Sequence, residues 1–343
     1  MMKNPLAIIF NDVHLQSNNE GEIVESINHL LNYAASKGIT NLICAGDFFE
    51  SRSFQRQSVL ITFDKILELI HKAGCTLYLF PGNHDKTEYA SYDSFLEIYK
   101  FYPGVIFNKE ISNIELGGVK ITLLPFYADS MLIPMIDAAE GGDVLISHFE
   151  MNGSINLGKV SEKSTITRRM LKKWKKTYLG HFHNTHEITK DIVHLPSLRQ
   201  NNFGEDSNKG FTILYDDLSY EIIKGRFREF NKIVIDVNKV SNQSIKEFIE
   251  LYRNGDSTIR FEFIGDESKL KSLDKEQFKD TGIDVKIVYS KSYDVTSKEV
   301  PKIIEKYDKS LVEDSFKAFC IEKGYDEEYG LKYLREFLEK VKK

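Results

Sequence analysis

The sequence contains little cysteine, and its cysteines show no paired spacing. Cys44, Cys75 and Cys320 are odd in number and lie far apart along 343 residues. This pattern excludes a disulfide framework and a structural zinc site built on thiolates. We expect the three side chains to act as small core hydrophobes in a reducing compartment.

Long apolar runs are also missing. No stretch approaches the roughly 18 apolar residues that a membrane-spanning helix requires, so none is predicted. The apolar segment nearest the N-terminus, Leu6–Phe10, is too short for the core of a signal peptide. We therefore expect no membrane partner and a cytoplasmic location, which would be the host cytoplasm for a phage-encoded protein.

The chain has no overall positive charge. Its formal net charge is −5, so any contact with nucleic acid requires a local basic patch. The segment from Lys163 to His186 lacks Asp and Glu and is predicted to form a helix over Ser164–Lys175. Its basic residues are Lys163, Arg168, Arg169, Lys172, Lys173, Lys175 and Lys176. They can form a solvated helix face, or a face that contacts phosphates.

Strand-like and helix-like segments alternate over roughly the first 220 residues, as in a layered α/β domain. Apolar runs predict strands at Leu6–Phe10, Asn41–Cys44, Thr76–Phe80, Ile111–Leu116, Lys120–Leu124, Asp143–Ser147, Thr177–Leu179, Glu187–Thr189, Ile192–Leu195, Phe211–Tyr215 and Tyr220–Ile223. Helical spacing is present in Glu22–Ser36, Val59–His71, Tyr92–Tyr99 and Met131–Ala139. The predicted fold class is α/β (α+β), a sandwich of two mixed sheets with helices outside.

A smaller unit is predicted after the connector at 225–231. Its order is strand Lys232–Val237, helix Gln243–Tyr252, strand Ser257–Phe263, a helix near Glu267–Phe278 and strand Asp284–Tyr289. A polar linker over Ser290–Pro301 and a helical segment over Leu311–Lys343 follow. We therefore divide the chain into domains 1–225, 226–292 and 293–343.

Polar side chains follow five of the apolar strands. They are Asp12, His14, Asp47, Asn83, His148, His181 and His183. The carboxyl ends of strands are where ligands bind in open α/β sheets, so we expect these groups to converge. Asp12 and His14 are an i, i+2 pair whose side chains converge if the backbone stays extended.

This set of side chains matches the requirements of two divalent cations. Two metals about 3.5–4 Å apart can activate water and clamp the attacking and leaving oxygens of a phosphate ester. A shared carboxylate must reach both ions, and Asp47 lies in the middle of the set. The mixture of imidazole, carboxylate and amide suits manganese, iron or zinc and is rich in nitrogen for magnesium or calcium.

Taken singly, each motif has an ordinary explanation. An isolated Asp-x-His is usually a loop, a Gly-Asp pair is usually a turn, and a histidine after a strand is usually structural. These explanations do not account for five of the nine histidines falling just after apolar strands. His29, His71, His186 and His194 show no such pattern and are interpreted as surface or structural residues.

The order of these motifs resembles the calcineurin-like metallophosphoesterase superfamily. The matching segments are Asp12-Val13-His14, Gly46-Asp47, Gly82-Asn83-His84-Asp85, Ser147-His148 and Gly180-His181-Phe182-His183. A narrower resemblance is to the SbcD-type DNA-repair nucleases, including phage recombination endonuclease subunits. It rests on Asp12–Leu15, Ser147–Gly153, Leu195-Pro196-Ser197, Phe203-Gly204-Glu205 and Lys209-Gly210-Phe211. Ser147 departs from that pattern, which more often has glycine there.

The resemblance implies a role for each of these positions. One metal would be held by Asp12, His14, Asp47 and His183, and the other by Asp47, Asn83, His148 and His181. His84 would be a catalytic residue that protonates the leaving oxygen or stabilises charge on the phosphate, and Asp85 would orient it. The implied metal is manganese, with magnesium, iron and zinc as alternatives.

The resemblance also implies a substrate and partners. It implies an exonuclease and endonuclease acting on double-stranded DNA ends and on single strands, in a homodimer. A capping domain would follow the nuclease domain, and C-terminal helices would bind an SbcC-type SMC-like ATPase. The apolar stripe Leu331, Leu334, Leu338 and Val341 suits such a contact, and a hairpin packed on its own chain is the less favoured alternative.

Two other functions use the same motifs. One is a phosphatase or nucleotide phosphodiesterase, which needs neither the added unit nor the amphipathic tail. The other is a binding module with a vestigial site, which is disfavoured because every ligand position is filled.

Overall fold

A computed structural model describes residues 3–156, 159–161, 164–253, 255–289 and Leu331. Met1–Val288 form one compact unit, and Tyr289–Lys343 form a second, of which only Tyr289 and Leu331 are described. The predicted linker over Ser290–Pro301 and, apart from Leu331, the predicted helical segment over Leu311–Lys343 lie outside the described residues. No helix in the described part of the chain is both long enough and apolar enough to span a membrane.

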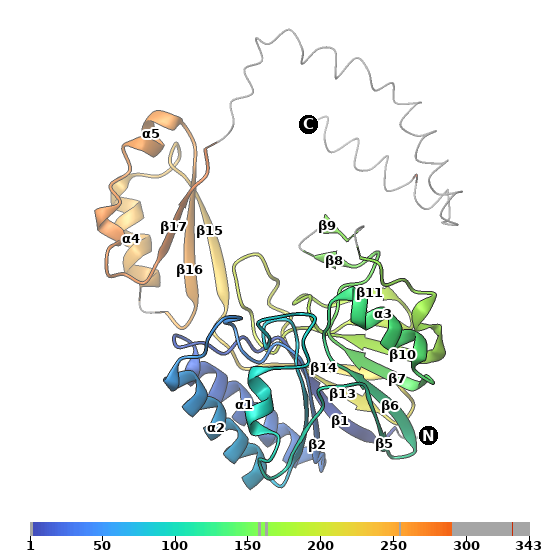
Figure 1. The fold of residues 1–343 in the computed structure, drawn as a ribbon. Coiled ribbons are helices and arrows are strands. Elements are labelled where there is room, and N and C mark those ends of the chain that lie inside the picture. Colours follow the sequence, from blue (N-terminus) through green and yellow to red (C-terminus); the bar gives the residue numbers. More distant parts are fainter. Residues whose placement is uncertain (1–2, 157–158, 162–163, 254, 290–330, 332–343) are drawn as a thin grey trace. The chain divides into compact units, whose positions relative to one another are not determined.

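The first sheet has six strands in the order β14-β13-β1-β2-β3-β4 (Figure 1). β1 (Pro5–Phe10), β2 (Asn41–Ala45), β3 (Thr76–Phe80) and β4 (Val105–Phe107) run parallel. β13 (Gly210–Tyr215) pairs antiparallel with β1, and β14 (Tyr220–Lys224) completes that edge. β4 was not expected from the sequence, because three residues are too short a run to show a period.

The second sheet also has six strands, in the order β11-β12-β10-β7-β6-β5. β6 (Val119–Leu124), β7 (Gly142–Ser147), β10 (Trp174–Leu179) and β12 (Ile192–His194) run parallel, whereas β5 (Ser112–Leu116) and β11 (His186–Thr189) form antiparallel edges. A short hairpin of β8 (Ile155–Asn156) and β9 (Lys159–Val160) lies outside both sheets.

The two sheets face each other across a shared apolar core. Ile9 and Ile43 from the first sheet belong to the same buried cluster as Ile121, Ile146 and Tyr178 from the second. The helices α1 (Glu20–Lys37) and α2 (Gln57–Lys72) cover the outer face of the first sheet, and α3 (Asp129–Ala138) packs on the second (Figure 1). The predicted sandwich of two mixed sheets flanked by helices is confirmed.

The predicted basic helix over Ser164–Lys175 is wrong. Only Met170–Lys173 form a short 3-10 turn, and β10 begins at Trp174. The apolar side chains of this segment are nevertheless buried, as Ile166, Leu171 and Trp174 show. Pairing of β10 with β7 on one side and β12 on the other outweighs the helical spacing of these residues.

Most of the basic residues around β10 already have partners. Lys173 donates hydrogen bonds to the carbonyls of Ile136, Asp137 and Ala139, which lie at the C-terminal end of α3. A cation is favourable there because the last carbonyls of a helix lack partners. Lys175 pairs with Asp143, and Lys176 pairs with Asp191. Within the described part of this segment, Arg168, Arg169 and Lys172 are left as exposed cations without an ion pair.

A third, smaller sheet has its own core. β15 (Phe230–Asp236), β16 (Thr258–Ile264) and β17 (Asp284–Ile287) run parallel, with α4 (Asn242–Tyr252) between the first two. The helix expected near Glu267–Phe278 is divided into α5 (Glu267–Lys271) and a 3-10 turn at Glu276–Phe278. Likewise, the helix expected over Tyr92–Tyr99 is a 3-10 turn at Phe95–Tyr99. The domain boundaries at 225/226 and 292/293 stay predictions.

Candidate metal centre

The polar residues predicted to bind metal lie together at the carboxyl ends of five parallel strands. Asp12 and His14 follow β1, Asp47 follows β2, and Asn83 follows β3 in the first sheet. The other three come from the second sheet, where β7 precedes His148 and β10 precedes His181 and His183. The site therefore lies where the ends of both sheets meet.

The side chains form two clusters that could each hold a cation. Asp12, His14 and His183 form the first, and Asp47, His148 and His181 form the second. In the first cluster, Nε2 of His14 lies 3.1 Å from Nε2 of His183. In the second, Nε2 of His148 lies 3.1 Å from Oδ2 of Asp47.

Each of the two aspartates is anchored through one oxygen and leaves the other facing the histidines. The backbone N–H of His84 donates to Oδ1 of Asp47 at 2.7 Å. Oδ2 of the same carboxylate faces both clusters, at 3.1 Å from His148 Nε2 and 3.8 Å from His14 Nε2. In Asp12, Oδ2 accepts from the backbone N–H of His181, whereas the buried Oδ1 has no hydrogen-bond partner. Asp47 is therefore positioned to be shared between two ions.

The side-chain amide of Asn83 belongs to the second cluster. Its Oδ1 lies 2.9 Å from Nδ1 of His181 and 3.1 Å from Nε2 of His148. With the oxygen directed at the rings, three lone pairs converge on one point, as a cation there would favour. With the amide reversed, its nitrogen donates to both rings and its oxygen accepts from Arg52 at 2.7 Å.

Three of the histidines have an oxygen atom beside Nδ1. The carbonyl of Ala45 lies 2.8 Å from Nδ1 of His148, and since a carbonyl can only accept, this Nδ1 carries the proton. Carboxylates lie at the same atom of the other two rings. Oε1 of Glu205 is hydrogen-bonded to His183 Nδ1 at 2.7 Å, whereas Oε2 of Glu50 lies 2.6 Å from His14 Nδ1 as an ion-pair contact without hydrogen-bond geometry. Hydrogen bonds of this kind fix the tautomers of His148 and His183, so that Nε2 is left to bind a metal.

The backbone that carries these side chains is strained. Asp12, His14, Asp47 and His181 all have positive φ, between 51° and 86°. Such a conformation is uncommon for residues other than glycine and clusters at functional sites. The sequence predicted that Asp12 and His14 converge along an extended backbone. They converge instead through turns with positive φ at both residues. The turn at each residue directs both side chains inward.

Position 82 requires glycine because the loop after β3 touches the loop after β2 there. A Cβ atom on Gly82 would lie 2.2 Å from Oδ1 of Asp47 and 2.4 Å from its backbone nitrogen. Gly82 lets the loop after β3 pack directly against the shared carboxylate.

The electrostatics of the site favour bound positive charge. Burial opposes ionisation, but the neighbouring histidines outweigh it and hold the pKa of Asp12 and of Asp47 below the usual range. Burial lowers the pKa of His14, yet the partners Asp12, Glu50 and Asp47 raise it to about 10. The carboxylates thus hold protons on nearby imidazoles, and a divalent cation can take the place of those protons. Together with the unpaired Oδ1 of Asp12, this shows that the residues present fit a metal centre.

His84 lies beside the two clusters and is oriented by the loop after β2. Its Nδ1 donates to the carbonyl of Glu50 at 2.6 Å, so Nε2 carries the lone pair of the neutral ring. Nη2 of Arg52 lies 2.8 Å from that Nε2. Burial, partly offset by Asp47, lowers the pKa of His84, and the charge of Arg52 lowers it further.

Asp85, which the resemblance implies would orient His84, forms no hydrogen bond with its ring among the described contacts. Its buried carboxylate accepts hydrogen bonds from the backbone N–H groups of Phe48, Phe49 and Gly82. Burial and the nearby Asp47 raise its pKa to about 6. Asp85 therefore joins the loop after β2 to the loop after β3, and so positions His84 only indirectly.

Three residues of the site were missed in the sequence. Glu50 and Arg52 follow Gly46-Asp47 in the same loop, and that proximity was the available signal. Glu205 lies in a segment that carried the family resemblance, but no role was assigned to it. Its contact with His183 spans 22 residues, and no periodic pattern reports a loop-to-loop contact of that kind.

We expect Glu205→Gln to weaken metal binding about 10–100-fold, the usual cost of losing an outer-shell partner. The amide keeps the shape of the side chain but removes the negative charge beside His183 and the buried Lys209. Titration calorimetry of the metal-free protein measures the affinity, and a thermal melt shows whether the fold is intact. Glu115→Gln, on exposed β5, is the matched control. Unchanged affinity in Glu205→Gln would mean that the carboxylate does not support a ligand.

Comparison with known proteins agrees with this geometry. The calcineurin-like phosphoesterase family matches residues 7–223, which contain all seven predicted ligands and His84. The chain belongs to this family and is a hydrolase of phosphate esters. The histidines and aspartates of the site are positioned for metal binding.

Two individual proteins are similar to the chain. Exonuclease subunit 1 of Enterobacteria phage T4 is 24% identical over 169 residues, which are 48% of this chain and 49% of that protein. The match thus spans about half the length of the relative. A dimetal phosphatase from Danio rerio has a TM-score of 0.45 at 9% identity, covering 62% of this chain and 93% of that one.

Proposed function

We propose that this protein is a manganese-dependent DNA nuclease that hydrolyses phosphodiester bonds at a two-metal centre. The observation that carries the chemistry is the shared carboxylate of Asp47, whose free oxygen faces both clusters of histidines. The resemblance to SbcD-type nucleases and the similarity to Exonuclease subunit 1 of phage T4 support DNA as the substrate.

The residues would divide into two ligand sets. Asp12, His14 and His183 with Asp47 would hold one ion, and Asn83, His148 and His181 with Asp47 would hold the other. Two divalent cations held there supply Lewis acidity that activates water and neutralises charge on the phosphate. The mixed nitrogen and oxygen donors suit manganese, and the same set accepts iron or zinc.

Two side chains beside the ligands would handle the substrate. Arg52 presents a guanidinium whose forked geometry matches phosphate oxygens. A bound phosphate would attract Arg52 away from Nε2 of His84, and its negative charge would favour the protonated imidazole. His84 would then donate its proton to the departing sugar oxygen while Glu50 holds the ring by Nδ1.

The DNA would need a positively charged contact in addition to the metals. Arg168, Arg169 and Lys172 are exposed and form no ion pair within the described residues. They precede β10, whereas His181 follows it, and six extended residues span about 20 Å. These cations would therefore contact phosphates of the DNA some distance along its backbone from the bond that is cleaved.

We further propose that the protein works with an SbcC-type ATPase through its C-terminal segment, within a homodimer in the cytoplasm. The support is the apolar spacing of Leu331, Leu334, Leu338 and Val341 in the sequence and the word "subunit" in the name of the phage T4 relative. Deletion of residues 308–343 should leave metal binding and cleavage of single strands intact, because every proposed ligand precedes residue 184. Co-purification with the ATPase should be lost. Continued co-purification would remove the tail from the interface.

Digestion of end-labelled DNA tests the central proposal. The metal-free protein is supplied with manganese and given single-stranded DNA, duplex DNA and a p-nitrophenyl phosphate monoester. We expect ladders of cleaved DNA that disappear with a chelator, and poor turnover of the monoester. Rapid turnover of the monoester with intact DNA would assign the protein to the phosphatases of its family instead.

A further inference from the structure

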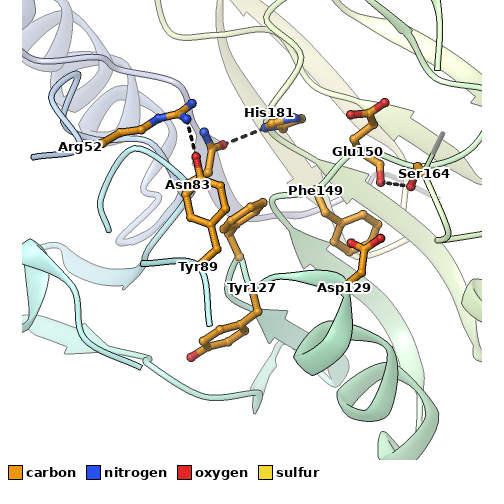
Figure 2. A pocket seen from close by; sticks show the side chains of 10 residues that line it. Arg52, Asn83, Tyr89, Tyr127, Asp129, Phe149, Glu150, Ser164 and His181 are labelled. Carbon is orange, nitrogen blue, oxygen red and sulfur yellow. Dashed lines mark hydrogen bonds between the residues drawn. The ribbon is translucent and has the colours of Figure 1, made fainter. Parts of the chain in front are cut away.

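A second cavity opens beside the metal centre. It has a volume of about 410 Å³, within the range of ligand-binding pockets, and shares Arg52, Asn83 and His181 with the site described above (Figure 2). Whatever occupies it would therefore lie next to the phosphate that the metal centre cleaves.

One side of this cavity is aromatic. Tyr89 and Phe126 meet edge to face with ring centroids 5.0 Å apart, and the ring of Phe126 is nearly parallel to that of His181, at 20°. Tyr127 and Phe149 are buried in the core under α3, whereas Tyr89 and Phe126 keep part of their surface exposed and belong to no core cluster among the described residues. Two partly exposed rings beside a polar site are available for stacking.

Contacts with Lys86 and Pro81 hold the aromatic side of the cavity in place. The fully buried Lys86 donates to the carbonyl of Phe126 at 3.2 Å, and its Nζ lies 3.7 Å from the ring centroid of Tyr127. The backbone N–H of Phe126 also donates to Pro81, at 2.9 Å. These contacts fix the position of Phe126 relative to the loop that carries Asn83, so the stacking surface exists before a ligand binds.

The other side of the cavity carries hydrogen-bond acceptors. Asp129, Glu150 and Ser164 lie across the cavity from Arg52, Asn83 and Tyr89 (Figure 2). Carboxylates repel a phosphate but accept hydrogen bonds from amino groups. The occupant should thus be flat and apolar on its faces, bear an N–H group at its edge, and be attached to a phosphate at the other end.

A nucleobase has these properties, and only an unpaired one has its edge free. We propose that this cavity binds one unpaired base of a nucleotide next to the scissile phosphate, stacked on Phe126 and Tyr89, and prefers bases with an exocyclic amino group. This inference rests on the proposed action on DNA. Stacking is sequence-tolerant because every base has a π-face. Asp129 and Glu150 would favour cytosine, adenine or guanine, whose amino group offers two N–H donors, over thymine, whose ring imide offers one.

Abasic substitution tests the cavity. Short single-stranded oligonucleotides, each with one abasic residue moved through the sequence, are digested with manganese and labelled at either end. We expect the bond adjoining the abasic residue, on one side only, to be cleaved about 5–100-fold more slowly at low substrate concentration, the range that loss of one stacked base implies. The defect should appear in KM more than in kcat, since stacking contributes to binding.

Phe126→Leu should remove this difference between normal and abasic sites, whereas Phe101→Leu, at a ring that is 86% exposed, should retain it. Asp129→Ala should retain the abasic effect but cleave oligo-dC and oligo-dT at similar rates. Asp129 also begins α3, so a thermal melt and the metal content establish that each variant is folded.

The outcomes separate the two proposals. Wild-type protein that cleaves normal and abasic bonds equally well would overturn the base-binding cavity and leave the nuclease assignment intact. Protein that binds manganese but cleaves no DNA of any kind would overturn the nuclease assignment and the cavity with it.

Discussion

Asp47→Ala is expected to abolish hydrolysis and to lower the metal content from two ions to one or none. Asp47 is the carboxylate whose free oxygen faces both clusters, at 3.1 Å from His148 Nε2 and 3.8 Å from His14 Nε2. Without it, neither ligand set is complete, and His148 is left buried without its nearest carboxylate. Elemental analysis of the purified variant gives the metal content, and digestion of labelled DNA gives the rate.

An unfolded Asp47→Ala variant would also lose metal and activity, so a more conservative substitution is compared with it. Asp47→Asn keeps an oxygen that can accept the hydrogen bond from the N–H of His84 but removes the negative charge. We expect it to fold, to bind metal weakly and to be nearly inactive. Asp64→Ala, on the exposed face of α2, is the control for loss of an aspartate elsewhere. If Asp47→Asn retained two ions and the wild-type rate, the shared-carboxylate assignment would be wrong.

The convergence of the seven proposed ligands could be predicted from the sequence because their positions follow a local rule. A short apolar run ending in Asp, Asn or His identifies both a strand and the end at which polar groups lie, as at Ile9-Phe10 before Asp12 and at Ile146-Ser147 before His148. Parallel pairing then brings those ends to one edge. Convergence of the seven residues follows from strand direction and did not require knowledge of any individual contact.

The supporting residues could not be predicted in the same way. Glu50, Arg52 and Glu205 act through loops, and the distance between two loops depends on how the two sheets pack. Asp85 illustrates the same difficulty, because its neighbour in sequence is His84 but its partners are backbone amides 36 and 37 residues away.

The mistaken helix before β10 has a different cause. Ile166, Leu171 and Trp174 fit helical spacing, and all three are buried. The same residues also fit an irregular segment that enters a strand, and periodicity over so few positions does not distinguish the two. Once β7 and β12 flank the segment, the backbone hydrogen bonds of a central strand decide the outcome.

His84→Gln is expected to lower the rate of DNA cleavage by about 10²–10⁴-fold, the usual contribution of a general acid, while both metal ions remain bound. The ring is not among the proposed ligands, and its Nδ1 is held by the carbonyl of Glu50, with Nε2 beside Arg52. Glutamine can form a hydrogen bond but cannot transfer a proton at neutral pH. Elemental analysis should therefore separate His84→Gln from Asp47→Asn, in which metal is lost.

Substrates with different leaving groups test whether His84 acts as a general acid. A sugar oxygen departs poorly without a proton, whereas p-nitrophenolate is stable as an anion and needs none. His84→Gln should thus impair cleavage of DNA far more than cleavage of bis(p-nitrophenyl) phosphate, and His71→Gln, an exposed histidine of α2, should impair neither. An equal loss on both substrates would show that His84 stabilises charge on the phosphate instead of protonating the leaving oxygen. Loss of metal from His84→Gln would place the ring among the ligands, next to His14 and Glu50, with which it already forms a third cluster of potential metal-binding groups.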